Sequence, residues 1–568
     1  MVGKCALTVL LFTVALTALA VPLGSYLARV FTGKRTLLSP LLRPVEGFIY
    51  RITAIHPFGE MSWRKYLIVL LVFNFWGLCL GYLLLRLQGV LPFNPTHRPG
   101  LPGPLAFNVI ASFVTNTNWQ AYAGETTMSC FSQMVVLAVQ NFLSAATGLA
   151  AAMALIRAFA ASEKETIGNF WVDLVRGLLY VLIPLSIILA VFLVSQGVVQ
   201  TLEPPAIVKT LEGFVQEIAR GPVASQEAIK LLGTNGGGYF NANSAHPFEN
   251  PNGLTNFTAM LSILLIPAAL PHTFGRLIKN PRQGWLIYAV MLSLFAAGAF
   301  TCAWIEAHGN PLFARLHFSP GPNLEGKEVR FGAVGAALFA VVTTAASCGA
   351  VNCLHDSLLP LGGLVPLANI LTGEVIFGGV GSGFYGMMAY ALLTVFLAGL
   401  MVGRTPEFLG KKVEGRDVRY ALAVLLVPSV LVLVFGALGA ILPAGRAGIT
   451  AAGPHGLTQV LYAFASAANN NGSAFGGLGA NLPFYLWTTA ACMLLGRFFP
   501  LAATLALAGS LAAKRYVAPG PGTFPTTGVT FALLLSAVIV IVGALTFFPA
   551  LTLGPVLEHL LLAQGRLF

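Results

Sequence analysis

Four short polar stretches, rich in Asn, Gly, Ser and Thr, interrupt a chain that is otherwise strongly apolar. Aligned with one another, they contain the triplets Asn116, Thr117 and Asn118; Thr234, Asn235 and Gly236; Ser347, Cys348 and Gly349; and Asn470, Asn471 and Gly472. Carbonyl and hydroxyl oxygens are neutral ligands, and rings of backbone carbonyls form the filters of potassium channels. Divalent cations usually require carboxylates, which no triplet contains. The triplets therefore favour potassium, while sodium, rubidium and ammonium fit the same pattern.

The third position of each triplet has a marked conformational preference. It is Gly at 236, 349 and 472 and Asn at 118. Gly adopts left-handed backbone conformations freely, and Asn tolerates them best among the rest. A strand that aims successive carbonyls at one axis needs such backbone angles, so the pattern predicts four related filter strands. Four unrelated turns are the alternative, but turns do not normally lie at apolar depth with a short helix before each.

The elements that position these stretches are predicted to be membrane helices. Of the 568 residues, 56% are hydrophobic and only 9% are charged, and the mean hydropathy is +0.80. Soluble domains carry about 25% charged residues. Apolar runs without strand-like alternation indicate helices rather than a membrane barrel. The predicted fold class is therefore an all-α integral membrane protein.

Ten spans are predicted, together with four shorter apolar helices that end at the polar stretches. The spans lie near 5–30, 66–88, 129–157, 175–197, 254–277, 284–306, 375–403, 420–441, 483–513 and 528–549. The short helices cover about 104–114, 225–233, 335–346 and 457–468. They are too short to cross a bilayer, which takes about 20 residues. Entering from outside, each would turn its partly negative carboxyl end toward the bilayer centre, which favours a cation there.

This arrangement predicts four fused helix–pore loop–helix repeats around a central pore, with one extra helix at each end. The predicted units are 1–65, with the first helix and a basic cytoplasmic loop; 66–157, 158–282, 283–419 and 420–515, the four repeats; and 516–568, with the last helix and tail.

Basic residues set the expected orientation. The net charge is +12, and 20 of the 32 Lys and Arg fall in or beside alternate loops, which the positive-inside rule places in the cytoplasm. Both termini are then expected outside, and nucleic-acid binding is not expected. A cleavable signal peptide ending near Ala20 would export Lys34 and Arg35, against this bias, so an uncleaved first helix is predicted.

Three further features within the apolar segments remain open to two interpretations each. Glu374, at the predicted start of span 7, and Arg497, in span 9, either form an ion pair or line the ion path below the filter, or simply reach toward the membrane surface. The glycine-rich run around Gly381 is either a gate or side exit, or a site of close helix packing. His355 and Asp356 are expected to form a local turn rather than a catalytic pair.

Other chemistry is not expected on this chain. The seven cysteines form no pattern typical of zinc sites. The glycine-rich segment 233–238 lacks the Gly-Lys-Ser/Thr ending of a phosphate-binding loop. The sequence therefore predicts neither nucleotide binding nor ATP hydrolysis by this chain itself.

Residues 115–120, 233–243, 246–251, 347–352, 403–412 and 469–475 strongly resemble motifs of the potassium-binding A subunits (KdpA) of bacterial Kdp potassium-transporting ATPases, in the superfamily of potassium transporters. The resemblance covers essentially the full length. It implies potassium ligands at all twelve triplet residues, with Thr115 and Gln120 beside the first filter strand. It also implies an inner-membrane complex with a P-type ATPase subunit (KdpB), an accessory subunit (KdpC) and a small single-span peptide (KdpF).

Two other functions compete with this one. A potassium transporter of the same superfamily that works without ATP would share the pore. An intramembrane enzyme acting on lipid or peptide would use His355 and Asp356. Potassium selection for an ATP-driven partner is the function that the sequence favours.

Overall fold

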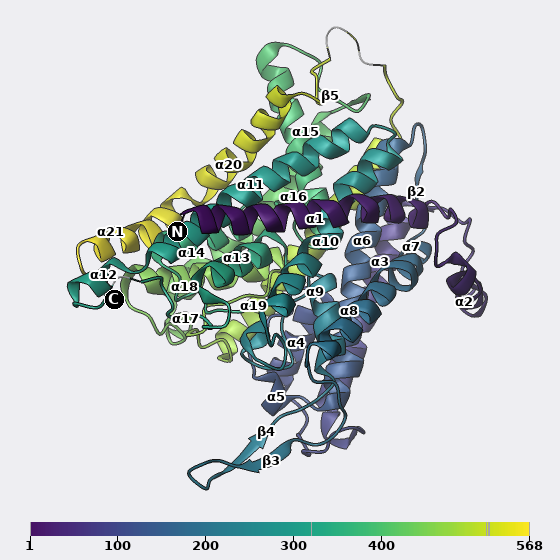
Figure 1. The fold of residues 1–568 in the computed structure, drawn as a ribbon. Helices are drawn as coiled ribbons and strands as arrows, with labels where there is room; N and C mark the ends of the chain where they lie inside the picture. Colours follow the sequence, from purple (N-terminus) through teal and green to yellow (C-terminus); the bar gives the residue numbers. More distant parts are fainter. Residues whose placement is uncertain (1, 320, 519, 521–522, 567–568) are drawn as a thin grey trace.

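The protein is a bundle of membrane-length helices, described here from a computed structural model for residues 2–319, 321–518, 520 and 523–566 (Figure 1). Within these residues, ten helical segments are long and apolar enough to cross a membrane. They are α1 (Val2–Phe31), α3 (Trp63–Arg86), η2 with α6 (Ser132–Ala138, Val139–Ala160), α7, η3 and α8 (Phe170–Arg176, Gly177–Leu182, Ile183–Ser195), α10 (Gly253–Leu277), α11 (Pro281–His308), α15 (Ser382–Val402), α16 (Gly415–Ile441), α19 (Pro483–Ala512), and α20 (Val529–Leu551), which continues into η5 and α21 (Thr552–Val556, Leu557–Ala563). The predicted all-α membrane fold with about ten spans is confirmed.

The four short helices also occur close to their predicted positions. They are α4 (Gly103–Val114), α9 (Val223–Leu232), α13 (Gly332–Ala345) and α18 (Gly453–Asn469). Each ends directly before a polar stretch. We call these four elements the pore helices.

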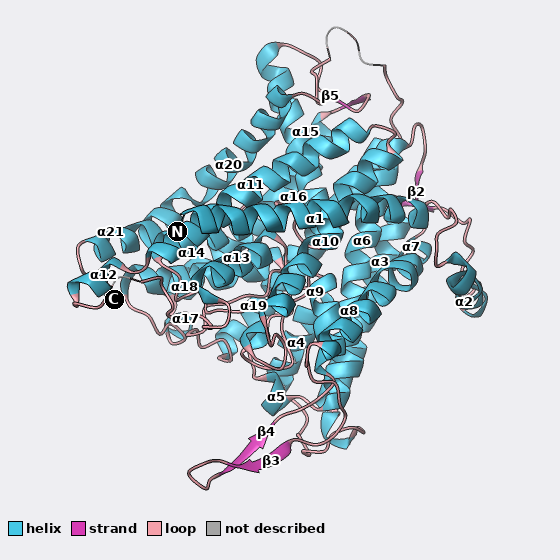
Figure 2. Cartoon of the chain, viewed as in Figure 1, coloured by secondary structure: helices cyan, strands magenta, loops and turns pink. Residues whose placement is uncertain are grey.

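The remaining elements are small. The helices are α2 (Ser39–Ile52), α5 (Gly124–Thr127), α12 (Pro311–Arg315), α14 (Pro360–Leu371) and α17 (Pro443–Arg446), with short turns η1 (Gln88–Val90) and η4 (Asn243–Ala245). The strands of the described residues form three antiparallel pairs: β1 (Met61–Ser62) with β2 (Thr166–Gly168), β3 (Ala206–Lys209) with β4 (Val215–Ile218), and β5 (Glu407–Phe408) with β6 (Lys411–Lys412). The β3–β4 pair projects from the bundle at the bottom of Figure 2. In the β3–β4 pair, Ala206 lies opposite Ile218 and Lys209 opposite Val215.

The predicted start of span 7 is wrong. In place of one helix over 375–403, the chain forms α14, an irregular segment, and then α15 from Ser382. Positive φ angles at Gly373, Gly378 and Gly381 interrupt the helix, because only Gly adopts such angles without strain. Glu374 therefore lies in this break rather than in a span.

Local sequence signals define several of the helix starts. The Asn252 side chain accepts hydrogen bonds from the first turn of α10, and Thr255 completes a capping box. Glu414 and Asp417 form an equivalent box at the start of α16. Pro at the first turns of α11, α14, α18 and α19 suits positions where no helical N–H bond is lost.

The core is built largely from small residues, which allow the helices to approach closely. In α6 nearly every residue from Ser144 to Phe159 is buried. A Cβ added at Gly24 of α1 would lie 2.7 Å from the Ala269 carbonyl oxygen of α10, so only Gly fits at this crossing. Such small-residue contacts are typical of membrane bundles. They hold the pore helices inside the bundle, with both chain ends on the same side of the molecule (Figure 1).

Candidate functional site

The four pore helices end with the same hydrogen bond. In each triplet, the backbone N–H of the middle residue donates to the carbonyl oxygen five residues earlier in the pore helix. The bonds are Thr117 to Ser112 (3.0 Å), Asn235 to Lys230 (2.9 Å), Cys348 to Thr343 (3.3 Å) and Asn471 to Ser466 (2.9 Å). This bond is the longer one of a Schellman-type helix end. The polar stretches therefore leave their helices along equivalent paths.

The backbone angles of the triplets follow the prediction in three repeats and depart from it in one. The third positions Asn118, Gly236 and Gly472 have φ of 57°, 94° and 100°. The first positions Asn116, Thr234 and Asn470 are also left-handed, at 68°, 49° and 60°. Because Thr is β-branched, Thr234 is strained there.

Gly349 has no positive φ, so the prediction of a left-handed third position is wrong for the third repeat. Steric crowding explains the Gly instead. A Cβ at this position would lie 2.8 Å from the Gly472 carbonyl carbon and 2.9 Å from the Asn471 carbonyl oxygen, closer than real Cβ contacts allow. Position 349 therefore requires Gly, because the backbone of the fourth polar stretch packs against it.

The four stretches meet in a closed ring, each touching the next. Asn116 Nδ2 donates to the Thr234 carbonyl (3.0 Å), the Gly349 N–H to the Asn235 carbonyl (3.2 Å), Asn471 Nδ2 to the Ala346 carbonyl (3.3 Å), and Asn470 Nδ2 to Thr117 Oγ1 (2.9 Å). These contacts join the first stretch to the second, the second to the third, the third to the fourth, and the fourth to the first. The sequence-predicted triplets are therefore brought together at one place.

The ring is buried and leaves polar oxygens free. The nine triplet residues other than the glycines are each at most 4% exposed. Among the described residues, the carbonyl oxygens of Thr117, Gly236, Gly349 and Asn471 accept no hydrogen bond. Because buried carbonyls are rarely left without a partner, these oxygens are candidate ligands for a cation. The side chains of Asn116, Asn235, Asn470 and Asn471 bridge the strands of the ring.

Thr115 and Gln120 flank the first triplet and fix its shape. Thr115 Oγ1 shares a hydrogen bond of 2.7 Å with Thr117 Oγ1. The Gln120 side chain pairs with the backbone of Gly238, donating to its carbonyl and accepting from its N–H, both at 3.0 Å. Gln120 therefore links the first polar stretch to the second by hydrogen bonds, at a point just after each triplet.

A wide cavity lies on one side of the ring and a narrow one on the other. The wide cavity, of about 780 Å³, is lined by all four stretches, including Asn118, Gly237, Gly349 and Gly472. The narrow cavity, of about 40 Å³, is lined by Ser347, Asn470 and Arg497. The ring thus separates a wide vestibule from a narrow, positively charged space.

Arg497 and Glu374 lie close to the ring but form no ion pair with each other within the described chain. Arg497 Nη2 instead donates to the Ser144 carbonyl (3.3 Å). Glu374 accepts from the Ser347 hydroxyl and, at 2.6 Å, from Asn471 Nδ2. The hypothesis of direct pairing does not hold in this structure. Glu374 instead links the third and fourth filter strands to each other.

The glycine-rich run around Gly381 packs tightly against the bundle. Gly381 has φ of 94°, and a Cβ there would lie 2.0 Å from the Gly148 carbonyl oxygen of α6. The neighbouring Val380 N–H donates to Thr234 Oγ1 (2.9 Å) in the second triplet. Of the two interpretations, the observed contacts are those of close packing, and they place the break between α14 and α15 directly under the ring.

A buried charged cluster behind the second filter strand was not predicted. Lys230 Nζ lies 2.7 Å from carboxylate oxygens of both Glu227 and Glu249 and donates to Asn243 Oδ1 (2.9 Å). Asn243 Oδ1 also accepts from the Val351 N–H (3.3 Å), just beyond the third triplet. We call Glu227, Lys230, Asn243 and Glu249 the buried charge cluster. The sequence feature that could have indicated this cluster is the pair of Glu227 and Lys230, three residues apart in a short and largely apolar helix.

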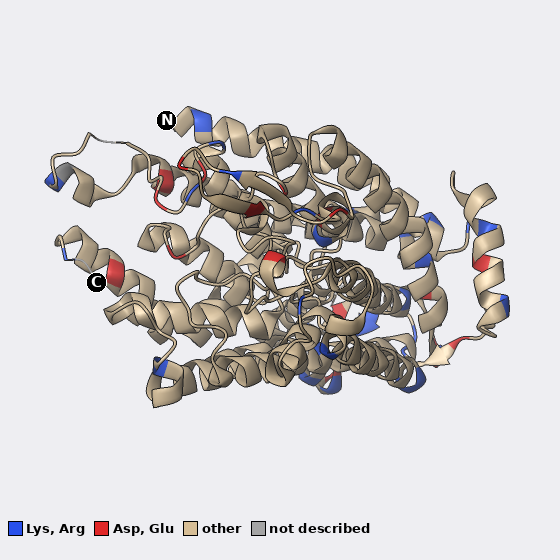
Figure 3. Ribbon diagram, turned by 90° about the horizontal axis from the view of Figure 1, so that it is seen from below, with Lys and Arg blue, Asp and Glu red and all other residues tan. Residues whose placement is uncertain are grey.

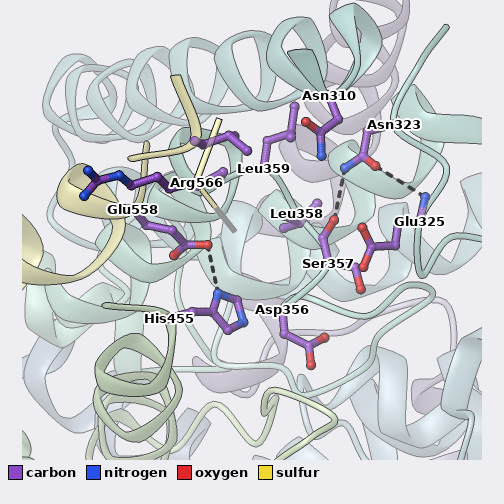
Figure 4. A pocket seen from close by; sticks show the side chains of 12 residues that line it. Asn310, Asn323, Glu325, Asp356, Ser357, Leu358, Leu359, His455, Glu558 and Arg566 are labelled. Carbon is purple, nitrogen blue, oxygen red and sulfur yellow. Dashed lines mark hydrogen bonds and ion pairs between the residues drawn. The ribbon is translucent and has the colours of Figure 1, made fainter. Parts of the chain in front are cut away.

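His355 and Asp356 make separate contacts. His355 Nδ1 is hydrogen-bonded to the Tyr462 hydroxyl (2.7 Å), whereas Asp356 lines a hollow of about 230 Å³ near the C-terminal helix (Figure 4). In the same hollow, His455 Nδ1 lies 2.9 Å from Glu558 Oε1. Burial disfavours the charged imidazole, but the Glu558 carboxylate outweighs this effect and raises the pKa of His455.

Comparison with known proteins places the chain in a family. The family model described as potassium-transporting ATPase A subunit matches residues 10–560. A potassium-transporting ATPase potassium-binding subunit of Methylorubrum extorquens is 56% identical over 558 residues, covering 98% of each chain. One of Bradyrhizobium diazoefficiens is 54% identical over 562 residues, covering 99% of each. Among solved structures, the potassium transporter TrkH of Vibrio parahaemolyticus has a similar fold, with a TM-score of 0.52 and 16% identity over 88% of this chain and 97% of that one.

Proposed function

Since the chain belongs to the family of potassium-transporting ATPase A subunits, we propose that it binds potassium and selects it for an ATP-driven transport assembly. The observation that carries this proposal is the closed ring of four neutral polar stretches, with buried carbonyl oxygens free to act as ligands. Neutral oxygens suit a weakly hydrated monovalent cation, whose hydration shell such a ring replaces.

The ligands in this proposal come from the twelve triplet residues. Four of the ligands would be the backbone carbonyl oxygens that accept no hydrogen bond, those of Thr117, Gly236, Gly349 and Asn471. The side chains of Asn116, Asn235, Asn470 and Asn471 bridge the strands and would hold those carbonyls at a fixed spacing. A ring with fixed spacing discriminates between cations by size and by the cost of removing water.

The proposed ion path runs from the wide vestibule through the ring to the narrow cavity. Below the ring, Arg497 lines that cavity and would repel a cation that moves straight on, which favours a lateral exit. Gly381 and its neighbours form the packed floor under the second and third strands. Glu374 would act on selectivity by holding Ser347 and Asn471 in place.

The assembly in this proposal contains a P-type ATPase catalytic subunit (KdpB), an accessory subunit (KdpC) and a small single-span subunit (KdpF), in the bacterial inner membrane. The basic loops support an orientation with both termini on the periplasmic side. The four repeats would comprise residues 66–157, 158–282, 283–419 and 420–515. ATP hydrolysis would take place on the partner, because this chain lacks a phosphate-binding loop.

The test is ATPase activity of the purified assembly as a function of potassium, with and without this chain. Activity that potassium stimulates only when this chain is present would support the proposal. If the chain alone in vesicles moved potassium under an ion gradient, and ATP had no effect on the full assembly, the alternative of a transporter working without ATP would replace it.

A further inference from the structure

Helix α2, which joins the first and second spans, exposes a continuous apolar stripe. Leu41, Val45, Phe48 and Ile52 are 72%, 42%, 62% and 67% exposed. Their spacing of four, three and four residues places them on one helical face. With 14 residues, α2 is about 21 Å long, too short to cross a bilayer. It protrudes from the bundle at the right of Figure 1.

The other side of α2 is fixed to the protein. The buried Glu46 side chain accepts hydrogen bonds from Arg176 Nε (2.9 Å), the Tyr180 hydroxyl (2.7 Å) and the Tyr50 hydroxyl (2.8 Å). Tyr50 packs with Val172 and Val175 of α7. Because the start of span 4 holds this face, the apolar stripe points away from the bundle in a defined direction.

Positive charge lies near both ends of α2. Arg43 and Arg51 lie on α2 itself, and Lys34 and Arg35 directly precede it. Lys34 and Arg43 line a small hollow between α1 and α2, whose lining also includes the ion pair of Glu46 and Arg176. Within the described chain, none of these four basic side chains lies within 4.0 Å of a carboxylate. The basic segments of α2 form the right edge of the molecule in Figure 3.

We propose that α2 is an interfacial anchor that inserts its apolar stripe into the cytoplasmic leaflet and binds anionic phospholipid headgroups through Lys34, Arg43 and Arg51. An exposed apolar face flanked by basic side chains is the pattern of helices that lie in the membrane surface. Anionic headgroups attract basic residues near the surface. Lys34 and Arg43 in the hollow between α1 and α2 are cationic donors of the kind that bind a phosphate group.

A lipid occupant fits this face better than a soluble protein partner does. Both ends of the α1–α3 connection enter spans, at Phe31 and Trp63, so α2 is held close to the membrane surface. The exposed stripe is apolar along its length and the charges nearest to it are basic, which suits the acyl and headgroup layers of an anionic membrane. The anchor would fix the end of α1 and the start of span 4 relative to the leaflet.

Spin labels at neighbouring positions of α2 test the proposal directly. Labels are placed at Phe48→Cys or Gly47→Cys in the full assembly, in vesicles containing phosphatidylglycerol, on a Cys79→Ala background; Cys79 is the one cysteine of the seven that is not buried. A Cβ at Gly47 has open space around it, so both variants should fold. We expect oxygen, which partitions into lipid, to relax the label at 48, and a water-soluble nickel reagent to relax the label at 47.

A label at 48 that the nickel reagent reaches would show a face in water and overturn the proposal. Protection of this label from both reagents would show a protein partner on the stripe and would also overturn it. Neither result depends on potassium transport, so failure of this inference is distinct from failure of the proposed function.

The headgroup preference is tested by lipid binding measured with native mass spectrometry. We expect Arg43→Gln to lower the affinity of the assembly for phosphatidylglycerol about fivefold, the effect of about one basic residue at an anionic surface. Arg515→Gln removes an exposed charge from the connection between α19 and α20 and should leave the affinity unchanged. Equal affinities in both variants and the unaltered protein would contradict the role of the α2 cations.

Discussion

At the scale of single residues, the ring depends on glycines that have no space for a side chain. Gly472 has φ of 100°, and a Cβ there would lie 1.9 Å from the Thr117 carbonyl oxygen. We predict that Gly472→Ala lowers the apparent potassium affinity of the assembly at least about tenfold, because the methyl group displaces a ligand carbonyl and strains the backbone. The measurement is potassium-stimulated ATPase activity against potassium concentration.

Gly436→Ala is the matched control, because a Cβ at Gly436 in α16 meets no atom within 4 Å. The apparent potassium affinity of the Gly436→Ala assembly should equal that of the unaltered assembly. An unchanged affinity in the Gly472→Ala assembly would contradict the ligand role of the ring.

Glu374 and Arg497 provide a second test at this scale. Glu374 and Arg497 each form hydrogen bonds to other residues and not to each other. We therefore predict that the double variant Glu374→Arg with Arg497→Glu does not rescue the transport defects of the two single variants. Each single change breaks buried hydrogen bonds to a charged group, worth about 1.5–3 kcal/mol each. Recovery of potassium uptake in the double variant would instead demonstrate direct pairing.

The meeting of the four triplets at one place could be predicted from the sequence, because their residue types recur at nearly even spacing after short apolar segments. The partners of Glu374 could not be found in this way. Ser347 and Asn471 lie 27 and 97 residues away, and only the closed ring brings them to its carboxylate. The same holds for Gly349, whose small size is required by another strand rather than by its own φ.

At the scale of elements, the buried charge cluster fixes pore helix α9 to its return loop. Removing Lys230 would leave the carboxylates of Glu227 and Glu249 buried without their cation. We predict that Lys230→Met destabilises the assembly by about 3–5 kcal/mol, the usual cost of breaking a buried pair, measured by thermal unfolding. Lys209→Gln, at an exposed site on β3, should have little effect.

Adding Glu227→Gln and Glu249→Gln to Lys230→Met should restore part of the lost stability, since the uncompensated charges are then gone. A Lys230→Met assembly that unfolds at the temperature of the unaltered protein would show that the cluster does not hold α9.

The contact between α18 and α21 is expected to depend on pH. The Glu558 carboxylate raises the pKa of His455 above its usual value near 6.5. The charged pair therefore stabilises the fold fully below that usual value, and its contribution is lost as the pH rises through the raised pKa. We predict that His455→Gln lowers the unfolding temperature at about pH 5.5 but not at about pH 9. A difference that is independent of pH would contradict this charged pair.

Helix boundaries were well predicted where caps and long apolar runs agree, as for α10 and α19. The start of span 7 was predicted wrongly, because a glycine-rich apolar segment keeps its high hydropathy where the helix is interrupted. Helix α2 was also missed. Its apolar residues recur at helical spacing among prolines and arginines, so it does not resemble a span.

At the scale of the whole molecule, the ten membrane-length segments found in the described residues and the four pore helices form a scaffold whose centre is polar. Charge and hydropathy predicted the number of spans, and the similar triplets predicted the ring. The polar stretches touch one another in the order in which they occur in the chain. A single chain thereby forms a closed ring of four stretches, of which the third differs most in its backbone angles.

We propose above that the four triplets bind potassium at one place. Anomalous diffraction from crystals of the assembly, grown with rubidium or thallium in place of potassium, would locate the bound ion. We expect an anomalous peak within the ring, coordinated by the carbonyl oxygens of Thr117, Gly236, Gly349 and Asn471. An empty ring, with the ion bound elsewhere in the chain, would contradict it.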